Sequence, residues 1–170
     1  MPALTRISLG ALAAGAVLAV APSPGSAAPA PAALSPAALE RSLLAQSNRV
    51  RTDAGLPRLR SSAVLRRPAR GHSRFLLSLG RLTHDGADGS PFWTRLVAAG
   101  FPAGRSTGEN LAQTSTCSAA AARTVVNAWL RSPGHRRNLL DRRFRLVGIG
   151  VAIAPGCATA TVTADYGAAG

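Results

Sequence analysis

The segment from residue 147 to 153 carries the pattern that most restricts the fold, because bulky and small side chains alternate strictly along it. Four β-branched residues occupy every second position, and two glycines and an alanine lie between them. A period of two residues is typical of a strand, here with one bulky face and one small face. Pro155-Gly156 then predicts a turn, and alternation resumes from Ala158 to Tyr166. We therefore expect the chain to end in a β-hairpin.

The part of the chain before this hairpin is predicted to be mainly helical. Helix starts are expected where a serine precedes a helical run, near Ser35, Ser61 or Ser62, Ser90 and Ser118. Pro68 is expected to kink or restart the second helix, since proline lacks the N–H and its ring clashes with the preceding turn. Ser132-Pro133 predicts one further turn that places His135 near its N-terminus. About four helices and a small, mainly antiparallel sheet indicate the α+β class.

The first 28 residues have the composition of a secretory signal peptide. One arginine precedes an uncharged Ala/Val/Leu-rich run over residues 7–21, and Ser26-Ala27-Ala28 offers small residues for cleavage. The run is too short and wrongly flanked for a membrane span, and a short buried helix is the alternative. Residues 29–34 are expected to form a disordered Pro/Ala stub, and residues 35–170 a single domain. The sequence thus predicts a protein that is secreted and extracellular.

The chain contains two cysteines, Cys117 and Cys157. In an exported protein an even number of cysteines indicates a disulfide, and two cysteines allow only one pairing. The bond would close a loop of about 40 residues and stabilise the fold by roughly 4 kcal/mol in the chain-entropy treatment. Two buried free thiols are the alternative. A zinc site built on these cysteines is disfavoured, because no C-x-x-C spacing is present.

The chain is strongly basic, with 20 arginines, no lysine, seven acidic residues and a formal net charge of +13. Without the arginine of the signal peptide, 19 basic and seven acidic side chains remain, or +12. The arginines crowd two stretches, residues 58–74 and 136–145. Such a surface is either a solvated face or a site for an anionic cell-envelope polymer or lipid. Charge alone would also suit nucleic acid, but secretion and the scarcity of aromatic residues argue against that partner.

Three short phrases carry most of the functional information. They contain a histidine, a glutamate and a second histidine: Leu82-Thr83-His84-Asp85-Gly86, Gly108-Glu109-Asn110-Leu111-Ala112 and Trp129-Leu130-Arg131-Ser132-Pro133-Gly134-His135-Arg136-Arg137-Asn138. In this order and spacing they resemble the bacterial branch of the CAP superfamily, the SCP-like extracellular domains related to cysteine-rich secretory proteins and plant pathogenesis-related proteins. The resemblance runs from about Leu39 to Tyr166.

The resemblance implies the αβα sandwich of CAP domains, with a further strand near residues 107–112. It also implies that His84, Glu109 and His135 line one cavity that can hold a divalent cation. Zinc is the expected ion, with the two histidines as ligands and Glu109 as a further candidate. Ser132 lies at the cavity edge, where animal and plant relatives have a second glutamate. A hydroxyl supplies no negative charge there, so we expect neither a four-residue acid/base site nor tight cation binding.

Each of these side chains also has a purely structural interpretation. His84 would close a turn, His135 would bond a neighbouring loop, and Glu109 would bond backbone N–H groups of its own turn. Ser132 is more consistent with a helix cap than with a nucleophile. His72 lies on an apolar helix face and is interpreted as a core histidine rather than as a ligand.

Two functions follow from these residues. The first is a non-enzymatic extracellular binding module, monomeric and without an organic cofactor. The second is a secreted, peptidase-like, metal-dependent hydrolase in which Glu109 acts as base on a metal-bound water. No H-E-x-x-H helix or G-x-S-x-G elbow supports the second function. Because metal binds neutral imidazole and nearby arginines favour that form, metal affinity should rise from mild acid through about pH 6 to 7.

Overall fold

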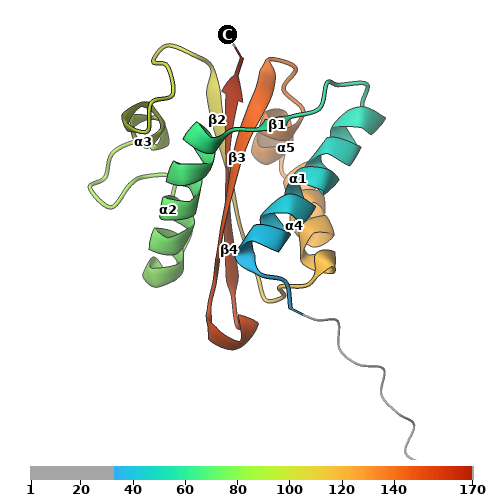
Figure 1. Cartoon of the computed structure of the whole chain (residues 1–170), viewed down its shortest axis with the longest axis vertical. Helices are drawn as coiled ribbons and strands as arrows, with labels where there is room; N and C mark the ends of the chain where they lie inside the picture. The colour runs from blue at the N-terminus through green and yellow to red at the C-terminus, as the bar shows by residue number, and fades with distance from the viewer. Residues whose placement is uncertain (1–32, 170) are drawn as a thin grey trace, which may run out of the picture. The chain divides into compact units, whose positions relative to one another are not determined.

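A four-stranded sheet forms the centre of the computed structural model, which describes residues 33–169 (Figure 1). The elements follow in the order α1 (Pro36–Asp53), β1 (Arg60–Ser61), α2 (Ala63–Leu79), α3 (Phe92–Ala98), β2 (Thr107–Thr114), α4 (Ala119–Arg131), α5 (Pro133–Leu139), β3 (Phe144–Ile153), a 3₁₀ turn (Pro155–Cys157) and β4 (Ala160–Ala168). The expected signal peptide, residues 1–28, lies outside the described residues, as does most of the expected stub. No helix within residues 33–169 is both long and apolar enough to cross a membrane.

The strands lie in the order β1-β3-β4-β2, and the predicted hairpin of β3 and β4 forms the middle of the sheet. β2 pairs antiparallel with β4 along its whole length, which confirms the strand expected near residues 107–112. β1 has only two residues, Arg60 and Ser61, and runs parallel to β3. Because two residues are too few to show a period, β1 is missing from the prediction, and it makes the sheet mixed.

Helices cover both faces of the sheet, as Figure 1 shows, with α2 and α3 on one side and α1, α4 and α5 on the other. The larger core lies on the α1/α4/α5 side and includes Leu39 and Trp129. Leu65, Leu96 and Phe101 form a smaller core beneath α2 and α3. The α+β prediction is confirmed. Residues 33–169 contain five α-helices where about four were expected, because the further turn expected before the hairpin is the seven-residue helix α5.

Helix α2 runs from Ala63 to Leu79 with Pro68 inside it, so the expected restart at this proline does not occur. Proline removes one hydrogen bond to the carbonyl four residues earlier, and this cost is local. Leu65, Ala69 and Leu76 of the same helix are fully buried. Tertiary packing of that apolar face supplies most of the stability of such a helix, and here it outweighs the lost bond.

The two cysteines form the predicted disulfide, with their Cα atoms 6.0 Å apart. Cys117 precedes α4, and Cys157 ends the 3₁₀ turn between β3 and β4. The bond therefore joins the start of a helix to the turn of the central hairpin.

Replacing both cysteines by serine should lower the free energy of unfolding by about 4 kcal/mol, since the unfolded chain loses the constraint of the disulfide loop. Urea unfolding followed by circular dichroism measures the loss. Wild type treated with a reductant is the matched control and should lose a similar amount. Equal stability of oxidised wild type and the double variant would contradict this role of the bond.

Candidate functional site

His84, Glu109, Ser132 and His135 line one cavity of about 310 Å³. The loop after α2 carries His84, and β2 carries Glu109. The junction of α4 and α5 brings Ser132 and His135 to the same place, and other residues of α5 complete the lining. The His84 side chain is 53% exposed, whereas the Glu109 side chain is completely buried. The cavity therefore extends from the solvent to a buried carboxyl group.

Two asparagine side chains hold α5 against β2. Asn110 Nδ2 donates a hydrogen bond to the His135 carbonyl oxygen at 2.9 Å. Asn138 Nδ2 donates to the Glu109 carbonyl oxygen and to Asn110 Oδ1, both at 3.0 Å. Both asparagines lie inside the sequence phrases, but only the contact between α5 and β2 reveals that they fix the positions of Glu109 and His135.

Ser132 occupies the N-cap position of α5, but its side chain makes no capping hydrogen bond. The Ser132 carbonyl oxygen instead accepts the first bond of the helix, from the Arg136 N–H at 2.8 Å. Among the described residues, no hydrogen bond joins Ser132 Oγ to His135. The cavity therefore lacks the serine–histidine contact that would activate a nucleophile.

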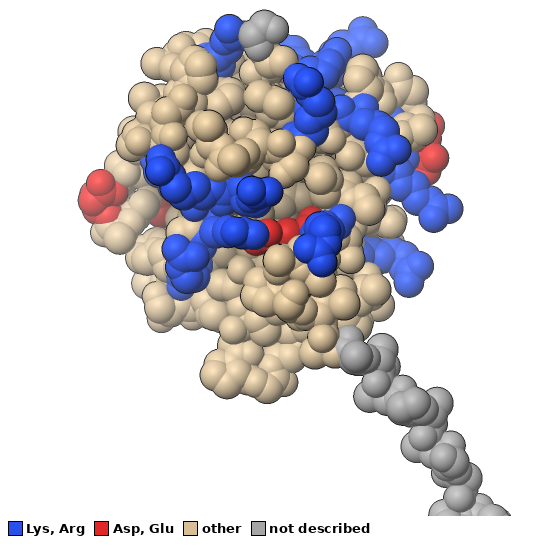
Figure 2. Space-filling model, in the orientation of Figure 1, with Lys and Arg blue, Asp and Glu red and all other residues tan. Residues whose placement is uncertain are grey.

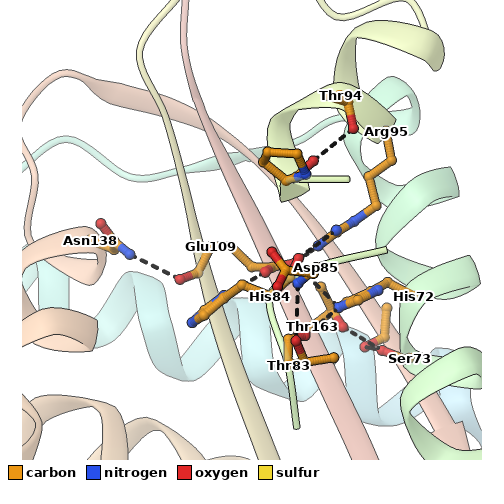
Figure 3. A network of polar contacts seen from close by, with 12 residues as sticks. His72, Ser73, Thr83, His84, Asp85, Thr94, Arg95, Glu109, Asn138 and Thr163 are labelled. Carbon is orange, nitrogen blue, oxygen red and sulfur yellow. Dashed lines mark hydrogen bonds and ion pairs between the residues drawn. The ribbon is translucent and has the colours of Figure 1, made fainter. Parts of the chain in front are cut away.

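Glu109 is the centre of a polar cluster, which Figure 3 shows from close by. Its Oε1 lies 2.6 Å from His84 Nδ1, and its Oε2 accepts a charge-assisted hydrogen bond from Arg95. Arg95 also donates to the His84 carbonyl oxygen at 2.9 Å. His72 is buried, with its Nε2 2.9 Å from the Thr83 carbonyl oxygen and 4.0 Å from Glu109 Oε2. No sequence pattern marks Arg95, which reaches the cluster because α3 lies beside β2.

A second carboxyl group, that of Asp165, lies beside Glu109. The two residues are directly opposite each other in the register of β2 and β4, and Asp165 is fully buried. Burial raises the pKa of Asp165 well above its usual range, and the neighbouring Glu109 raises it further. Asp165 therefore keeps its proton to a higher pH than an ordinary aspartic acid does. The carboxyl group nearest to Glu109 along the sheet thus comes from β4, but Asp165 does not line the cavity.

The three histidines differ in proton affinity. The hydrogen bond to Glu109 raises the pKa of His84 above that of an ordinary histidine, and this effect exceeds the opposing effect of burial. Arg95 lowers the pKa of His84, as expected of a nearby arginine, but the bond to Glu109 outweighs this effect, so the net shift is upward. Burial lowers the pKa of His135, and the neighbouring His84 lowers it further. Burial also lowers the pKa of His72. His84 is thus the imidazole that takes up a proton first as the pH falls.

The cavity offers two imidazoles to a metal ion and few other ligands. When the His84 ring is neutral, its Nδ1–H donates to Glu109 and Nε2 is left to ligate. The Glu109 oxygens contact His84 and Arg95. Within residues 33–169, no group of three or more His, Cys, Asp or Glu side chains is arranged to hold a metal ion. These contacts do not fit a closed structural site, which would need four protein ligands.

Comparisons with known proteins agree on one family. The model of the CAP, or cysteine-rich secretory protein, family matches residues 44–166. An outer surface protein of Borrelia burgdorferi has a TM-score of 0.67 at 20% identity, covering 78% of this chain and 93% of its own. An extracellular SCP-domain protein of Bacillus anthracis has a TM-score of 0.67 at 25% identity, covering 79% of this chain and 41% of its own. NaASP2, crystallised with Zn²⁺, has a TM-score of 0.56 at 14% identity, and the match covers 78% of this chain and 80% of the NaASP2 chain. A search of curated proteins found no significant match.

Proposed function

Since this chain belongs to the CAP family of cysteine-rich secretory proteins, we propose that it is a secreted, non-enzymatic binding module. Its cavity would hold a divalent cation, with zinc as the first candidate. Its arginine-rich surface would attach it to an anionic envelope polymer or lipid. The observation that carries the proposal is that His84, Glu109 and His135 line one solvent-accessible cavity.

Three observations support secretion. Residues 1–28 have the composition of a signal peptide, and the Cys117–Cys157 disulfide is typical of an oxidising compartment. The similar structures include an outer surface protein and an extracellular protein. These features are consistent with a domain that acts outside the cell.

Cation binding is supported by the bond between Glu109 and His84. A metal-binding histidine commonly donates its other ring N–H to a carboxylate, which fixes the tautomer and makes the ligand more basic. Glu109 Oε1, 2.6 Å from His84 Nδ1, is suited to this orienting role. We therefore propose His84 and His135 as the ligands and Glu109 as the residue that orients His84. NaASP2 is a structural relative that was crystallised with Zn²⁺.

A metal-dependent hydrolase remains the alternative, and the contacts of Glu109 argue against it. A general base needs a carboxylate oxygen that can reach the attacking water. Here one oxygen contacts His84 and the other accepts from Arg95. The neighbouring carboxyl group, Asp165, is fully buried, and its pKa is raised, so it is a poor candidate for the base as well. Hydrolysis of a small peptide or ester substrate that disappears in a His84→Ala variant would favour the alternative.

Zinc titration calorimetry at neutral pH tests the cavity directly. Glu109→Gln should weaken zinc binding by roughly 10- to 100-fold, because the amide no longer accepts the His84 proton as a carboxylate does. His135→Ala should weaken binding at least as much, since a ligand itself is lost. Asp53→Asn removes an exposed carboxylate from α1, outside the cavity, and should bind zinc like wild type. Equal affinity in His135→Ala and wild type would place the ion elsewhere, and no binding to wild type would refute the cation site.

The pH dependence of zinc binding should follow His84. Zinc ligation requires neutral imidazole, so protons and metal compete for the ring. Because the bond to Glu109 raises the pKa of His84, affinity should be lost as the pH falls through a value above the ordinary ~6.5. His135, whose pKa is lowered, is already neutral in that range. Calorimetry at a series of pH values should therefore show a loss that begins at lower pH in Glu109→Gln than in wild type. The same midpoint in both proteins would contradict this role of Glu109.

Attachment to an anionic surface should be independent of the cavity. Co-sedimentation with vesicles containing an acidic phospholipid should weaken as salt rises, because exposed charges are screened. His84→Ala should sediment like wild type. No binding at low salt would leave the arginines as a solvated face.

A further inference from the structure

The outer edge of strand β3 has no strand partner over much of its length. β1 pairs with this edge only opposite Leu146 and Val147. Beyond that point, no other strand within residues 33–169 pairs with it, because the sheet order ends at β1. The part of β3 from Gly148 to Ile153 therefore has a strand neighbour, β4, on one side only.

Backbone hydrogen-bonding groups point outward along this edge. The Val151 N–H donates to Glu40 Oε1 at 3.3 Å, which shows that the backbone groups of Val151 face away from β4. Alternate residues of an antiparallel strand direct their N–H and C=O groups to the same side. Ile149 and Ile153 therefore also present an N–H and a C=O to the outer edge.

This edge forms the floor of a groove between α1 and α2. Two cavities of about 610 and 210 Å³ lie along it and share Glu40. The larger one is lined by residues 151–153 of β3, and the smaller one by Val147 and Ile149. Both have residues of α1 on one wall and residues of α2 on the other, so the groove follows the strand.

The walls of the groove are strongly basic. Four arginines line it, Arg41 on α1 and Arg66, Arg70 and Arg74 on α2. Glu40 is the only acidic lining residue, and Arg70 binds both of its carboxylate oxygens, at 2.8 and 2.6 Å. Figure 2 shows this face, with arginines on both sides of a small acidic spot. The groove therefore has a clear excess of positive charge.

Glu40 indicates what kind of ligand the groove accepts. One carboxylate oxygen of Glu40 accepts both the Val151 N–H at the strand edge and a guanidinium N–H of Arg70. A peptide laid along β3 would offer backbone oxygens to the edge and acidic side chains to the arginines. We propose that the edge of β3, between α1 and α2, binds an extended acidic peptide segment of another protein by strand addition.

Charge selects this occupant over a second copy of the same chain. Two copies paired edge to edge would bring the arginines of both grooves together, and like charges across an interface are unfavourable. A polyanion without a peptide backbone would satisfy the arginines but not the row of N–H and C=O groups. The proposal is independent of the cation site, because none of these groove residues lines the His84/His135 cavity.

Fluorescence anisotropy with a labelled peptide of alternating glutamate and valine tests the proposal. The wild-type protein should bind this peptide. A second peptide of the same sequence, in which every other backbone amide is N-methylated, should bind at least about tenfold more weakly. N-methylation preserves the charge and removes the backbone donors. Equal binding of both peptides would mean that the groove recognises charge alone, which would overturn strand addition, as would no binding.

Two kinds of variant separate the backbone contribution from the charge contribution. Ile153→Pro removes an outward N–H at a position where an edge strand tolerates proline, and should weaken binding by at least about tenfold. Arg66→Glu combined with Arg74→Glu should abolish binding. Arg123→Glu combined with Arg131→Glu makes the same change in charge at exposed positions of α4 and should leave binding unchanged. The proposal would be overturned if folded Ile153→Pro bound the peptide as tightly as wild type. It would also be overturned if the groove and α4 charge variants lost the same amount of affinity.

Unlike the preceding variants of the groove, Glu40→Ala is expected to strengthen peptide binding. This substitution frees the Val151 N–H and Arg70 for the peptide, so it should tighten binding several-fold even if it lowers stability. Circular dichroism establishes that the variant is folded. Weaker binding by the folded variant would show that Glu40 belongs to the binding surface rather than standing in for the peptide, and would overturn that part of the proposal.

Discussion

Gly150→Ala is expected to lower the free energy of unfolding by at least about 3 kcal/mol. A Cβ atom at this position would lie 2.2 Å from the carbonyl carbon of Ala69 and from the nitrogen of Arg70. Both atoms belong to the backbone of α2, so the helix itself would have to move away from the sheet. Gly148 is in the same situation, with the Leu65 carbonyl carbon 2.1 Å from the added atom. Urea unfolding measures the loss.

Gly71→Ala is the matched control, because it makes the same change on the helix that packs against Gly150. Apart from the adjacent residues and the neighbouring backbone of the helix itself, no atom lies within 4 Å of a Cβ added there, and the residue lies inside α2. This substitution should stabilise the protein by roughly 0.5–1 kcal/mol, as alanine does in a helix. Gly150→Ala with the stability of wild type would mean that α2 and β3 can separate at little cost, and would contradict the tight contact.

Arg51→Met is expected to destabilise the fold by about 3 kcal/mol or more, because each buried acceptor left without a donor costs about 1–3 kcal/mol. Arg51 is fully buried, and its guanidinium donates to four carbonyl oxygens. Nε donates to Pro57 at 2.9 Å, Nη1 to Leu139 at 2.9 Å and Asp141 at 3.0 Å, and Nη2 to Phe144 at 3.0 Å. Methionine fills much of the space but leaves these acceptors without their donors. Because Leu139 ends α5, the change should also loosen the helix that carries His135.

Arg49→Met is the control for this substitution. Arg49 is exposed on the same helix, so its loss should change stability by less than about 0.5 kcal/mol. Arg51→Lys should fall between the two, since an ammonium group retains the charge but lacks the planar fork of donors. Unfolding of Arg51→Met at the same urea concentration as wild type would contradict the prediction. It would mean that the free-energy cost of burying the Arg51 charge equals the stabilisation from its hydrogen bonds.

Features that depend on neighbours in the chain were predicted correctly. The alternation from residue 147 to 153 predicts β3, because side chains of a strand point to opposite faces in turn. The serine before α2, Ser62, and the serine before α4, Ser118, lie at the N-cap positions of these helices. The pairing of Cys117 with Cys157 follows from their number alone. The three phrases around His84, Glu109 and His135 identify the family through residues on three separate elements.

Features that depend on contacts between distant segments were missed or wrong. β1 exists only because Arg60 and Ser61 meet β3, so two residues far from that strand cannot signal it. Of the kink or restart expected at Pro68, the restart does not occur, because burial of one face holds α2 together. Arg95 and Asp165 join Glu109 through the packing of α3 and the register of β2 with β4, which no local pattern encodes.

The sequence by itself thus determined the class of fold, the disulfide and the family, because period, composition and short motifs are local properties. Only the tertiary structure decided how the cavity residues interact. The hydrogen bond between Glu109 and His84 raises the pKa of His84 and outweighs the opposing effects of burial and of Arg95, so the net shift is opposite to the one expected from the arginine content of the sequence. The open edge of β3 beside four arginines likewise appears only when α1 and α2 are placed along it. Proton affinity and hydrogen-bonding capacity depend on distance and desolvation, and both are set by the packing of segments that lie far apart in the chain.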